Sequence, residues 1–200
     1  MYFFTSDIHF NDPEILEMER RPFSSCEQFN EFVFEVWNTQ ASSGDTIFVV
    51  GDFLDCNNGD SALWKTSIGY PSRLNADVVL IAGNNEERVI THFFGGDFEK
   101  FREECLKNGF KDVLRSADIS FGGYDFHLVH KPKDYKEGVL NLFGHVHRAG
   151  GLYMPFGFNV CCDLNHFRLV TEEDVIYYIG TKNNYWDHDT NLLLRFKKQQ

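Results

Sequence analysis

The chain has 200 residues, of which 42% are hydrophobic and 24% are charged, as in an ordinary globular protein with one domain or one domain and a small appendage. Its formal net charge of −11 argues against long DNA or RNA and against an anionic membrane as tightly held partners. The charge does not exclude a small phosphate ester, because bound divalent metal ions would reverse the sign locally.

The five cysteines show no CxxC spacing, and their number is odd. Cys161 and Cys162 are adjacent on an expected strand. We expect all five, Cys56 included, to be reduced packing residues in a cytoplasmic protein. The first residues run straight into a strand-like segment without a basic n-region, so no signal peptide is expected. No apolar stretch reaches the roughly 18 residues that a membrane span needs.

Strand-like and helical segments alternate in the first half of the chain. Apolar or β-branched runs that end at polar residues or glycine predict strands over Tyr2–Thr5, Thr46–Val50 and Val78–Ile81. Apolar side chains at helical spacing predict a helix over Glu27–Asn38. Helices are also expected over Ser61–Leu74 and over Asp97–Asn108, which Gly109 closes.

The second half of the chain is richer in strands. The GGYD segment between two strand-like runs predicts a hairpin. The expected strands are Ile119–Phe121, Phe126–Val129, Val139–Phe143, Phe158–Cys162 and Arg168–Val170. A short helix is expected over Thr171–Tyr178, with Thr171 as its cap and Asp174 three residues on. We assign residues 1–200 to a single α/β domain built as a layered sandwich, and leave the tail from about residue 180 open.

Polar side chains follow most of the expected strands, where ligand groups gather in open α/β sheets. The set contains four imidazoles and three carboxylate or amide groups: Asp7, His9, Asp52, Asn84, His130, His145 and His147. A mixed nitrogen and oxygen set suits Mn²⁺, Fe, Zn²⁺ or similar ions and is too rich in nitrogen for Ca²⁺. Seven side chains are more than one octahedral ion would take while keeping a water, so two ions that share a bridging aspartate are expected.

The segments SDIH, GDFLD, AGNNE, LVHKP and GHVH occur in this order, each just after an expected strand. Together they resemble the calcineurin-like metallophosphoesterases, whose pattern is D-x-H, G-D, G-N-H-[DE], H and G-H-x-H. The resemblance runs from Tyr2 to about Val175 and includes Arg21-Pro22-Phe23, which is similar to a segment of small bacterial and phage members. It implies the metallophosphoesterase fold, an α/β-β/α sandwich of two mixed sheets flanked by helices.

The resemblance also implies a role for each polar residue. The ligands of one ion would be Asp7, His9 and His147, and those of the other would be Asn84, His130 and His145. Asp52 would bridge the two ions, for which Mn²⁺ is preferred and Fe, Zn²⁺ and Ni²⁺ are alternatives. A metal-bridging hydroxide would attack phosphorus in line with the leaving oxygen. The expected substrate is a small phosphomonoester or phosphodiester, with nucleotides and cyclic nucleotides as candidates.

One position departs from the family pattern. Asn85 stands where the family has a histidine that lies near the leaving group and helps to protonate it. Asparagine cannot deliver a proton at pH 7, and general-acid help is worth about 10²–10⁴-fold in rate. We expect the change to slow the loss of alkyl leaving groups most. The catalytic residues are predicted to be Asn85, Asp52 and His130, and other candidate proton donors are His92, His127 and His166.

A second departure follows SDIHF, where similar members often continue with Gly-His and this chain has Asn11-Asp12. Arg21 and Lys131 are predicted to bind the substrate phosphate, and the alternative for each, as for Arg20, is a solvated surface charge. Asp55 is expected to support the site or to form a turn. Glu86 is expected to be a helix-start or supporting carboxylate and not a ligand.

Two other functions are open at this point. A protein of this fold could bind partners as a scaffold with little activity, a reading that missing ligands would favour, but all seven are present. A nuclease that acts on polymers is the other alternative, and the acidic balance weighs against it. The sequence leaves the natural substrate and the oligomeric state open.

Overall fold

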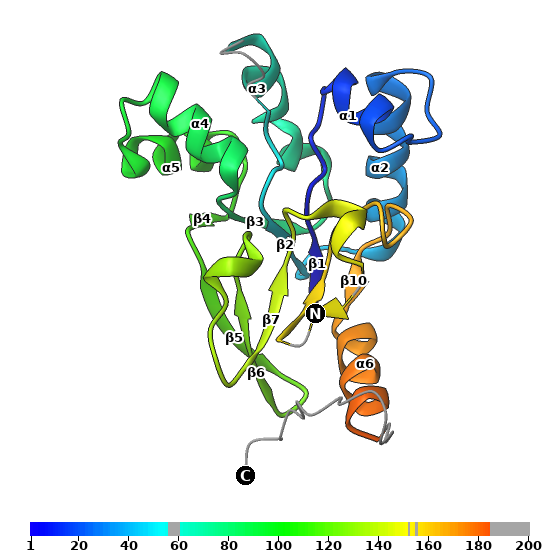
Figure 1. The fold of residues 1–200 in the computed structure, drawn as a ribbon. Helices are drawn as coiled ribbons and strands as arrows, with labels where there is room; N and C mark the ends of the chain where they lie inside the picture. The colour runs from blue at the N-terminus through cyan, green and yellow to red at the C-terminus, as the bar shows by residue number, and fades with distance from the viewer. Residues whose placement is uncertain (56–60, 152, 155, 185–200) are drawn as a thin grey trace.

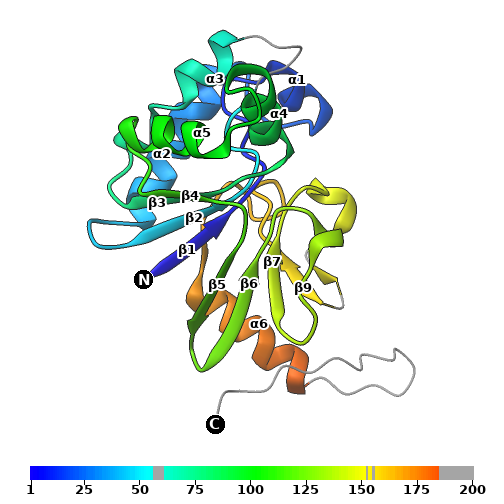
Figure 2. The ribbon, with the colours of Figure 1, turned by 90° about the vertical axis from the view of Figure 1, so that its left-hand side faces the viewer.

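The structure, a computed structural model, describes residues 1–55, 61–151, 153–154 and 156–184. Two mixed sheets pack face to face, and Figures 1 and 2 show helices α1–α5 on one side of the first sheet and the second sheet on its other side. This is the α/β-β/α sandwich that the resemblance implies. Cys56 and the tail beyond residue 184 lie outside the described residues.

The first sheet has a parallel centre with one antiparallel edge strand. Its order is β10-β1-β2-β3-β4, and only β10 runs antiparallel to its neighbour. The strands span β1 (Tyr2–Thr5), β2 (Thr46–Val50), β3 (Asp77–Ile81), β4 (Asp112–Leu114) and β10 (Val170–Thr171). Because β1, β2 and β3 are parallel, the chain leaves all three at the same edge of the sheet.

The second sheet begins with the predicted hairpin. Its order is β5-β6-β7-β9-β8, with antiparallel pairs at both edges and parallel pairs in the centre. The strands span β5 (Ala117–Phe121), β6 (Tyr124–Leu128), β7 (Leu140–Phe143), β8 (Tyr153–Met154) and β9 (Gly157–Asn159). The segments after β6 and β7 therefore also leave this sheet at one edge.

The first sheet separates the core into two layers, one of which the helices cover. The helices span α1 (Pro13–Met18), α2 (Cys26–Gln40), α3 (Ser61–Ser67), α4 (Asn84–Phe93), α5 (Phe98–Lys107) and α6 (Glu172–Asn184). One layer lies between the first sheet and α2–α5 and buries Trp37, Val49 and Phe101 completely. The other lies between the two sheets, where Phe4 and Leu142 are completely buried and α6 adds apolar side chains. Within the described residues, no helix is long and apolar enough to cross a membrane.

Several predicted boundaries differ from the structure. The expected helix over Ser61–Leu74 ends at Ser67, and a separate 3₁₀ turn follows over Tyr70–Arg73 with Pro71 in its first turn. A proline lacks the N–H that a continuous helix would need there. The expected strand Phe158–Cys162 is shorter, at Gly157–Asn159, and Arg168–Val170 is replaced by Val170–Thr171.

The helix α4 was not predicted as an element, and neither were the short elements α1, β4 and β8. The helix predicted from Thr171 is confirmed: Thr171 Oγ1 accepts from the Asp174 N–H at 3.0 Å, and the helix continues to Asn184. The described cysteines are free thiols, as expected: Cys26, Cys105, Cys161 and Cys162.

Candidate metal centre

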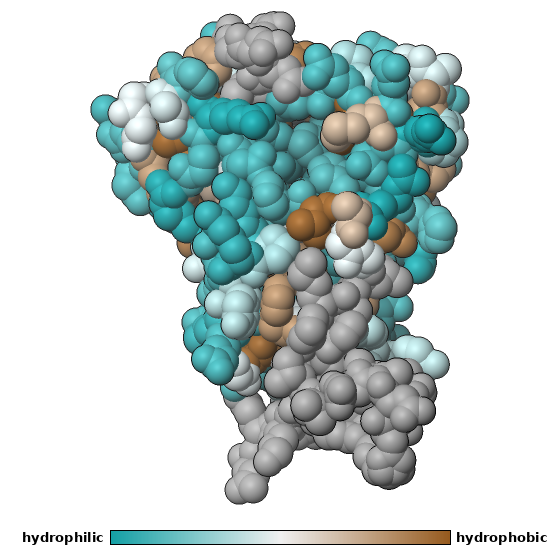
Figure 3. Space-filling model, in the orientation of Figure 1, coloured by the Kyte–Doolittle hydropathy of each residue, from teal (hydrophilic) through white to brown (hydrophobic). Residues whose placement is uncertain are grey.

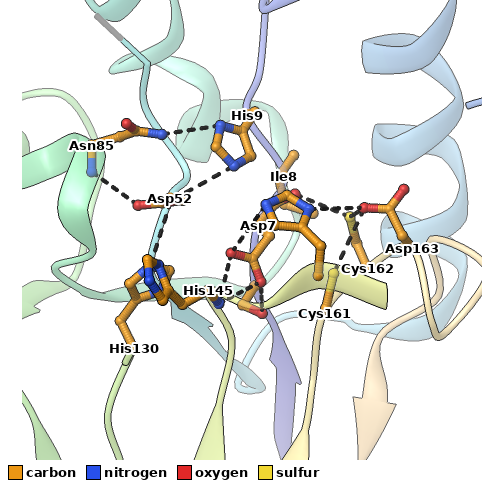
Figure 4. A network of polar contacts seen from close by, with 12 residues as sticks. Asp7, Ile8, His9, Asp52, Asn85, His130, His145, Cys161, Cys162 and Asp163 are labelled. Atoms are coloured by element: carbon orange, nitrogen blue, oxygen red, sulfur yellow. Dashed lines mark hydrogen bonds and ion pairs between the residues drawn. The ribbon is translucent and has the colours of Figure 1, made fainter. Parts of the chain in front are cut away.

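All seven predicted ligands lie at the edge where the chain leaves the carboxyl ends of the strands of both sheets. Asp7 and His9 follow β1, Asp52 follows β2, and Asn84 begins α4 directly after β3. The remaining ligands follow β6 and β7 of the second sheet: His130, His145 and His147. Figure 4 shows the side chains of Asp7, His9, Asp52, His130 and His145 converging on one region.

Backbone hydrogen bonds hold these loops together beyond the strands. The N–H of Asp7 donates to the Gly51 carbonyl and that of His9 donates to the Asp52 carbonyl, both at 3.0 Å. The two sheets are joined at Asp7, whose carboxylate accepts from the His145 N–H at 2.9 and 3.1 Å. Asp7 is completely buried, so its position is fixed by both sheets at once.

Three motif glycines are required by close packing at this edge. A Cβ on Gly51 would lie 2.1 Å from His130 Nδ1, and one on Gly83 would lie 2.3 Å from Asp52 Oδ1. A Cβ on Gly144 would lie 2.5 Å from Asp7 Oδ2. These contacts explain why glycine precedes the ligand in the G-D, G-N and G-H segments.

Five of the predicted ligands have left-handed backbone conformations. Their φ angles are 58° for Asp7, 53° for His9, 54° for Asp52, 73° for His145 and 43° for His147. Such conformations are uncommon for residues other than glycine and are often found where function demands a side-chain direction that ordinary geometry does not give. The sharp turns aim successive side chains into the same space.

The ligand atoms form two groups that share Asp7, and the buried Asp52 belongs to the second. His9 Nε2 and His130 Nε2 lie 3.7 and 3.4 Å from Asp52 Oδ2, on either side of that carboxylate. In the first group, atoms of Asp7, His9 and His147 lie within 4.8 Å of one another. The second group joins Asp7, Asp52 and His130 in the same way.

Asn84 and His145 lie beside His130 of the second group. Asn84 Oδ1 lies 3.1 Å from His130 Nε2, and the rings of His130 and His145 are 5.1 Å apart between centroids. The structure thus brings the seven residues to one place, with Asp7 common to both groups and Asp52 close to His9 and His130. Their role as ligands stays a prediction.

An unpartnered nitrogen indicates that this donor set fits a metal ion. Among the described residues, His9 Nε2 is buried, has no hydrogen-bond partner and lies 3.7 Å from Asp52 Oδ2. A buried polar atom without a partner costs free energy, and a cation at the site would satisfy such lone pairs. Imidazole nitrogens with carboxylate and amide oxygens are the donors that first-row divalent metals prefer.

The charges at the site favour a proton on His130 when no metal is bound. Burial raises the pKa of Asp52, but the interactions with His130 and His9 lower this pKa by more than burial raises it. The pKa of Asp52 is therefore well below its usual range. Burial lowers the pKa of His130, and the Asp52 carboxylate raises it more, to about 9. At neutral pH a proton on His130 would therefore have to leave before that nitrogen could bind a metal ion.

Glu86 supports the loop that carries Asp52. Its completely buried carboxylate accepts from the backbone N–H groups of Asp52, Phe53, Leu54 and Gly83 at 2.8–2.9 Å. Burial and the nearby Asp52 charge raise the pKa of Glu86 to about 7. Glu86 is thus a supporting carboxylate at the start of α4, in agreement with the expectation from the sequence.

The prediction that Arg21 binds substrate is wrong. The residue is only 5% exposed, and its guanidinium donates to the carbonyls of Asp7 and Ile8 at 2.7 Å. It also donates to both carboxylate oxygens of Asp163 at 2.9 and 2.8 Å. Asp163 Oδ2 in turn lies 3.6 Å from His147 Nδ1. Arg21 therefore supports the loops that carry Asp7 and His147.

A cavity of about 310 Å³ opens at the predicted ligands. Its described lining includes His9, Asp52, Asn84, His145 and His147, together with the apolar Ile15 and Met18. Its other residues are polar or charged: Asp12, Glu14, Asp55, Asn85 and Arg88. The face drawn in Figure 3 is largely hydrophilic around helices α1, α4 and α5.

The second departure from the family pattern lies in this cavity. Asp12 caps α1 through the Glu14 N–H at 2.9 Å. Burial and a hydrogen bond with Asp55 raise the pKa of Asp12 to about 6. Asp55 Oδ2 lies 3.6 Å from His9 Nδ1, so Asp55 supports the site.

The other predicted contacts lie elsewhere. Lys131 does not line this cavity but two neighbouring ones, beside His130 and beside His145. None of the candidate proton donors lines it either: His92, His127 and His166. His127 instead pairs with Asp118 at 2.7 Å on the second sheet.

Asn85 lies beside Asp52 and His9, and the residue is only 3% exposed. Its N–H donates to Asp52 Oδ1 at 3.0 Å, and its Nδ2 lies 3.1 Å from His9 Nδ1. Sequence reasoning missed two neighbours, Asp163 and Arg88. The spacing of Arg88, one helical turn after Asn85, is a signal that could have found it, whereas the contact of Asp163 spans the whole chain.

Comparison with known proteins agrees with these observations. The calcineurin-like phosphoesterase family matches residues 2–189. An uncharacterized protein of Methanocaldococcus jannaschii is 30% identical over 127 residues, which are 64% of this chain and 56% of that protein. The chain thus spans little more than half the length of this relative.

Two solved structures are also similar. A protein of unknown function from Aquifex aeolicus aligns with a TM-score of 0.64 and 20% identity over 89% of this chain and 98% of that one. A phosphoesterase from E. coli aligns with a TM-score of 0.41 and 16% identity over 80% and 77% of the two chains. The first shows the same fold. Because the family match covers nearly the whole chain and its motifs meet at one sheet edge, the protein belongs to the calcineurin-like phosphoesterases, a family that depends on divalent metal ions.

Proposed function

We propose that this protein is a dinuclear metal-dependent phosphoesterase that hydrolyses a small phosphomonoester or phosphodiester. The observation that carries the proposal is the buried Asp52 carboxylate with a histidine nitrogen within 3.7 Å on each side. One carboxylate between two sets of ligands is the arrangement that a pair of metal ions requires. The first ion would be held by Asp7, His9 and His147, and the second by Asn84, His130 and His145.

The bound ions would supply an activated water and a charge clamp for in-line displacement at phosphorus. The chain's own residues fix the geometry of that clamp. Asp7 is held by both sheets, Asp52 by the Asn85 N–H, and the loop after β2 by Glu86. Such prior ordering matters because groups that are already oriented lose little entropy when the ester binds.

The cavity and the charge support a small substrate. A cavity of about 310 Å³ is at the lower end of the range for small-molecule sites. A net charge of −11 does not suit a long polyanion, which argues for a nucleotide-sized ester over a polymer. We expect Mn²⁺ to be the preferred ion, with Fe, Zn²⁺ and Ni²⁺ as alternatives that the same nitrogen and oxygen donors would also accept.

The test is hydrolysis of p-nitrophenyl phosphate and bis-p-nitrophenyl phosphate by the Mn²⁺-loaded protein. Asp52→Ala should abolish turnover, whereas Asp77→Ala, at the opposite end of β3 and about half exposed, should leave it unchanged. A panel of nucleotides and cyclic nucleotides would then identify the substrate class. If Mn²⁺, Fe²⁺, Zn²⁺ and Ni²⁺ are not taken up and none supports turnover, the protein is a binding or scaffold protein on this fold.

A further inference from the structure

Arg88 is the only arginine or lysine among the described residues that line the cavity at the predicted ligands. It lies on α4, one helical turn after Asn85, and is exposed. The same cavity is bordered by the carboxylates of Asp12, Glu14 and Asp55. These three carboxylates would repel an anionic ester that enters the cavity. The positive charge of Arg88 can offset this repulsion.

Arg88 is held by an amide and not by a carboxylate. Its Nη1 donates to Asn85 Oδ1 at 2.8 Å, and in the described part of the chain it has no other hydrogen bond and no ion pair. Most other arginines of the chain do have a carboxylate partner: Arg21, Arg73, Arg102, Arg115 and Arg148. Among the described residues, no carboxylate therefore pairs with Arg88, and the only acceptor of its guanidinium is Asn85 Oδ1.

The amide links Arg88 to the centre of the site. Asn85 is buried, its N–H is bonded to Asp52, and its Nδ2 lies 3.1 Å from His9 Nδ1. The side chain of Asn85 therefore has a fixed direction, with Oδ1 toward Arg88. The hydrogen bond to Asn85 fixes one edge of the Arg88 guanidinium. The other N–H groups of the guanidinium can donate to an oxyanion.

We propose that Arg88 binds a phosphoryl oxygen of the substrate and that Asn85 is the residue that positions it. The inference rests on the proposed phosphoesterase function and names a contact within the same site. It replaces direct action of Asn85 on the ester by action through its neighbour. A guanidinium pairs with phosphate through two parallel N–H bonds, which a lysine ammonium cannot reproduce.

The test measures binding of orthophosphate to the Mn²⁺-loaded protein by calorimetry, with metal content determined on the same samples. Arg88→Ala should weaken orthophosphate binding roughly 10- to 100-fold, as expected for a lost charged hydrogen bond, with unchanged metal content. Arg88→Lys should recover part of the loss. The control is Arg168→Ala, which removes an exposed arginine that lines a different cavity and should change nothing.

A double-mutant cycle tests the role of Asn85. Asn85→Ala should weaken orthophosphate binding less than Arg88→Ala, and the double variant should be no weaker than Arg88→Ala alone. Additive losses would contradict positioning by Asn85.

The outcomes separate this inference from the proposed function. If Arg88→Ala binds orthophosphate as tightly as the unmodified protein, or if the unmodified protein binds none, the inference is overturned. If orthophosphate binding depends on Arg88 but no ester is hydrolysed, the contact is established and the catalytic proposal fails. If esters are hydrolysed and Arg88→Ala leaves both KM and phosphate binding unchanged, only the contact is refuted.

Discussion

Arg21 and Asp163 form a buried ion pair between segments that are 142 residues apart, with Nε and Nη2 of the guanidinium donating to the two carboxylate oxygens. The pair joins the turn after α1 to the loop after β9, and Asp163 continues the contact to His147. Burial raises the pKa of Asp163, but the interactions with His147 and with the Arg21 guanidinium lower this pKa more, to well below its usual range. The first and last predicted ligands are thus held by one buried arginine.

Replacing this arginine should damage both stability and metal binding. Arg21→Gln would leave the Asp163 carboxylate buried without its charge partner, which typically costs about 3–5 kcal/mol. The loosened Asp163–His147 contact should also lower metal affinity roughly 10- to 100-fold. Thermal unfolding and chelator competition measure the two effects. Arg20→Gln, at the exposed neighbouring position, is the control and should change neither; equal behaviour of the two variants would refute the support role.

The difference between Arg21 and Arg20 shows what the sequence could not provide. Strand and helix patterns predict the order of the segments, and the motifs predict that Asp7, Asp52 and Asn84 meet, because each follows a parallel strand. Local patterns do not say which of two adjacent arginines turns inward. That depends on Asp163, which comes close only after both sheets have packed. The same reason explains why β4 and β8 were missed: three-residue and two-residue strands gain most of their stability from neighbours and carry little periodic signal of their own.

Glu86 offers a second test of the support around Asp52. Glu86→Gln would place an amide N–H₂ group among four backbone donors, so one or more of these N–H groups would lose its acceptor. We expect a loss of about 1–3 kcal/mol in the free energy of unfolding, measured by urea denaturation. The matched control is Glu87→Gln, whose side chain is 42% exposed and whose ion pair with Arg115 should contribute about 0–1 kcal/mol. A smaller effect at position 86 than at 87 would contradict the assignment.

Gly83 should tolerate no side chain. A Cβ there would lie 2.7 Å from the Asp52 backbone nitrogen, an atom that cannot swing away. Gly83→Ala should therefore displace Asp52, lower stability by about 1–3 kcal/mol and reduce metal uptake. Gly69→Ala is the control, since no atom lies within 4 Å of its Cβ position and its φ is −84°. Metal content after desalting, together with the melting temperature, distinguishes a local effect on the site from general unfolding.

Metal affinity should depend on pH through His130. Its pKa in the metal-free protein is raised from 6.5 to about 9, so its proton stabilises that form fully below about pH 6.5 and the stabilisation is lost as pH rises through 9. A metal ion on His130 must displace this proton, so affinity should rise by about tenfold per pH unit until pH 9 and then level off. Chelator competition at pH 6.5, 7.5 and 8.5 measures this slope. A flat profile would mean that His130 is already neutral when no metal is bound.

Asn85→His tests how the leaving oxygen acquires its proton. An imidazole at this position could deliver a proton, which an amide cannot, and such help is worth up to about 10²–10⁴-fold for poor leaving groups. We therefore expect the variant to raise kcat for alkyl phosphates more than for p-nitrophenyl phosphate, whose leaving group needs little protonation.

Asn85→Gln is the control, since it keeps an amide without adding an acid. Because Asn85 also holds Arg88, the histidine should weaken orthophosphate binding at the same time. A gain in kcat with a loss in phosphate affinity would assign the two effects to one position, whereas equal or lower rates on both esters would show that Asn85 is not simply a missing acid.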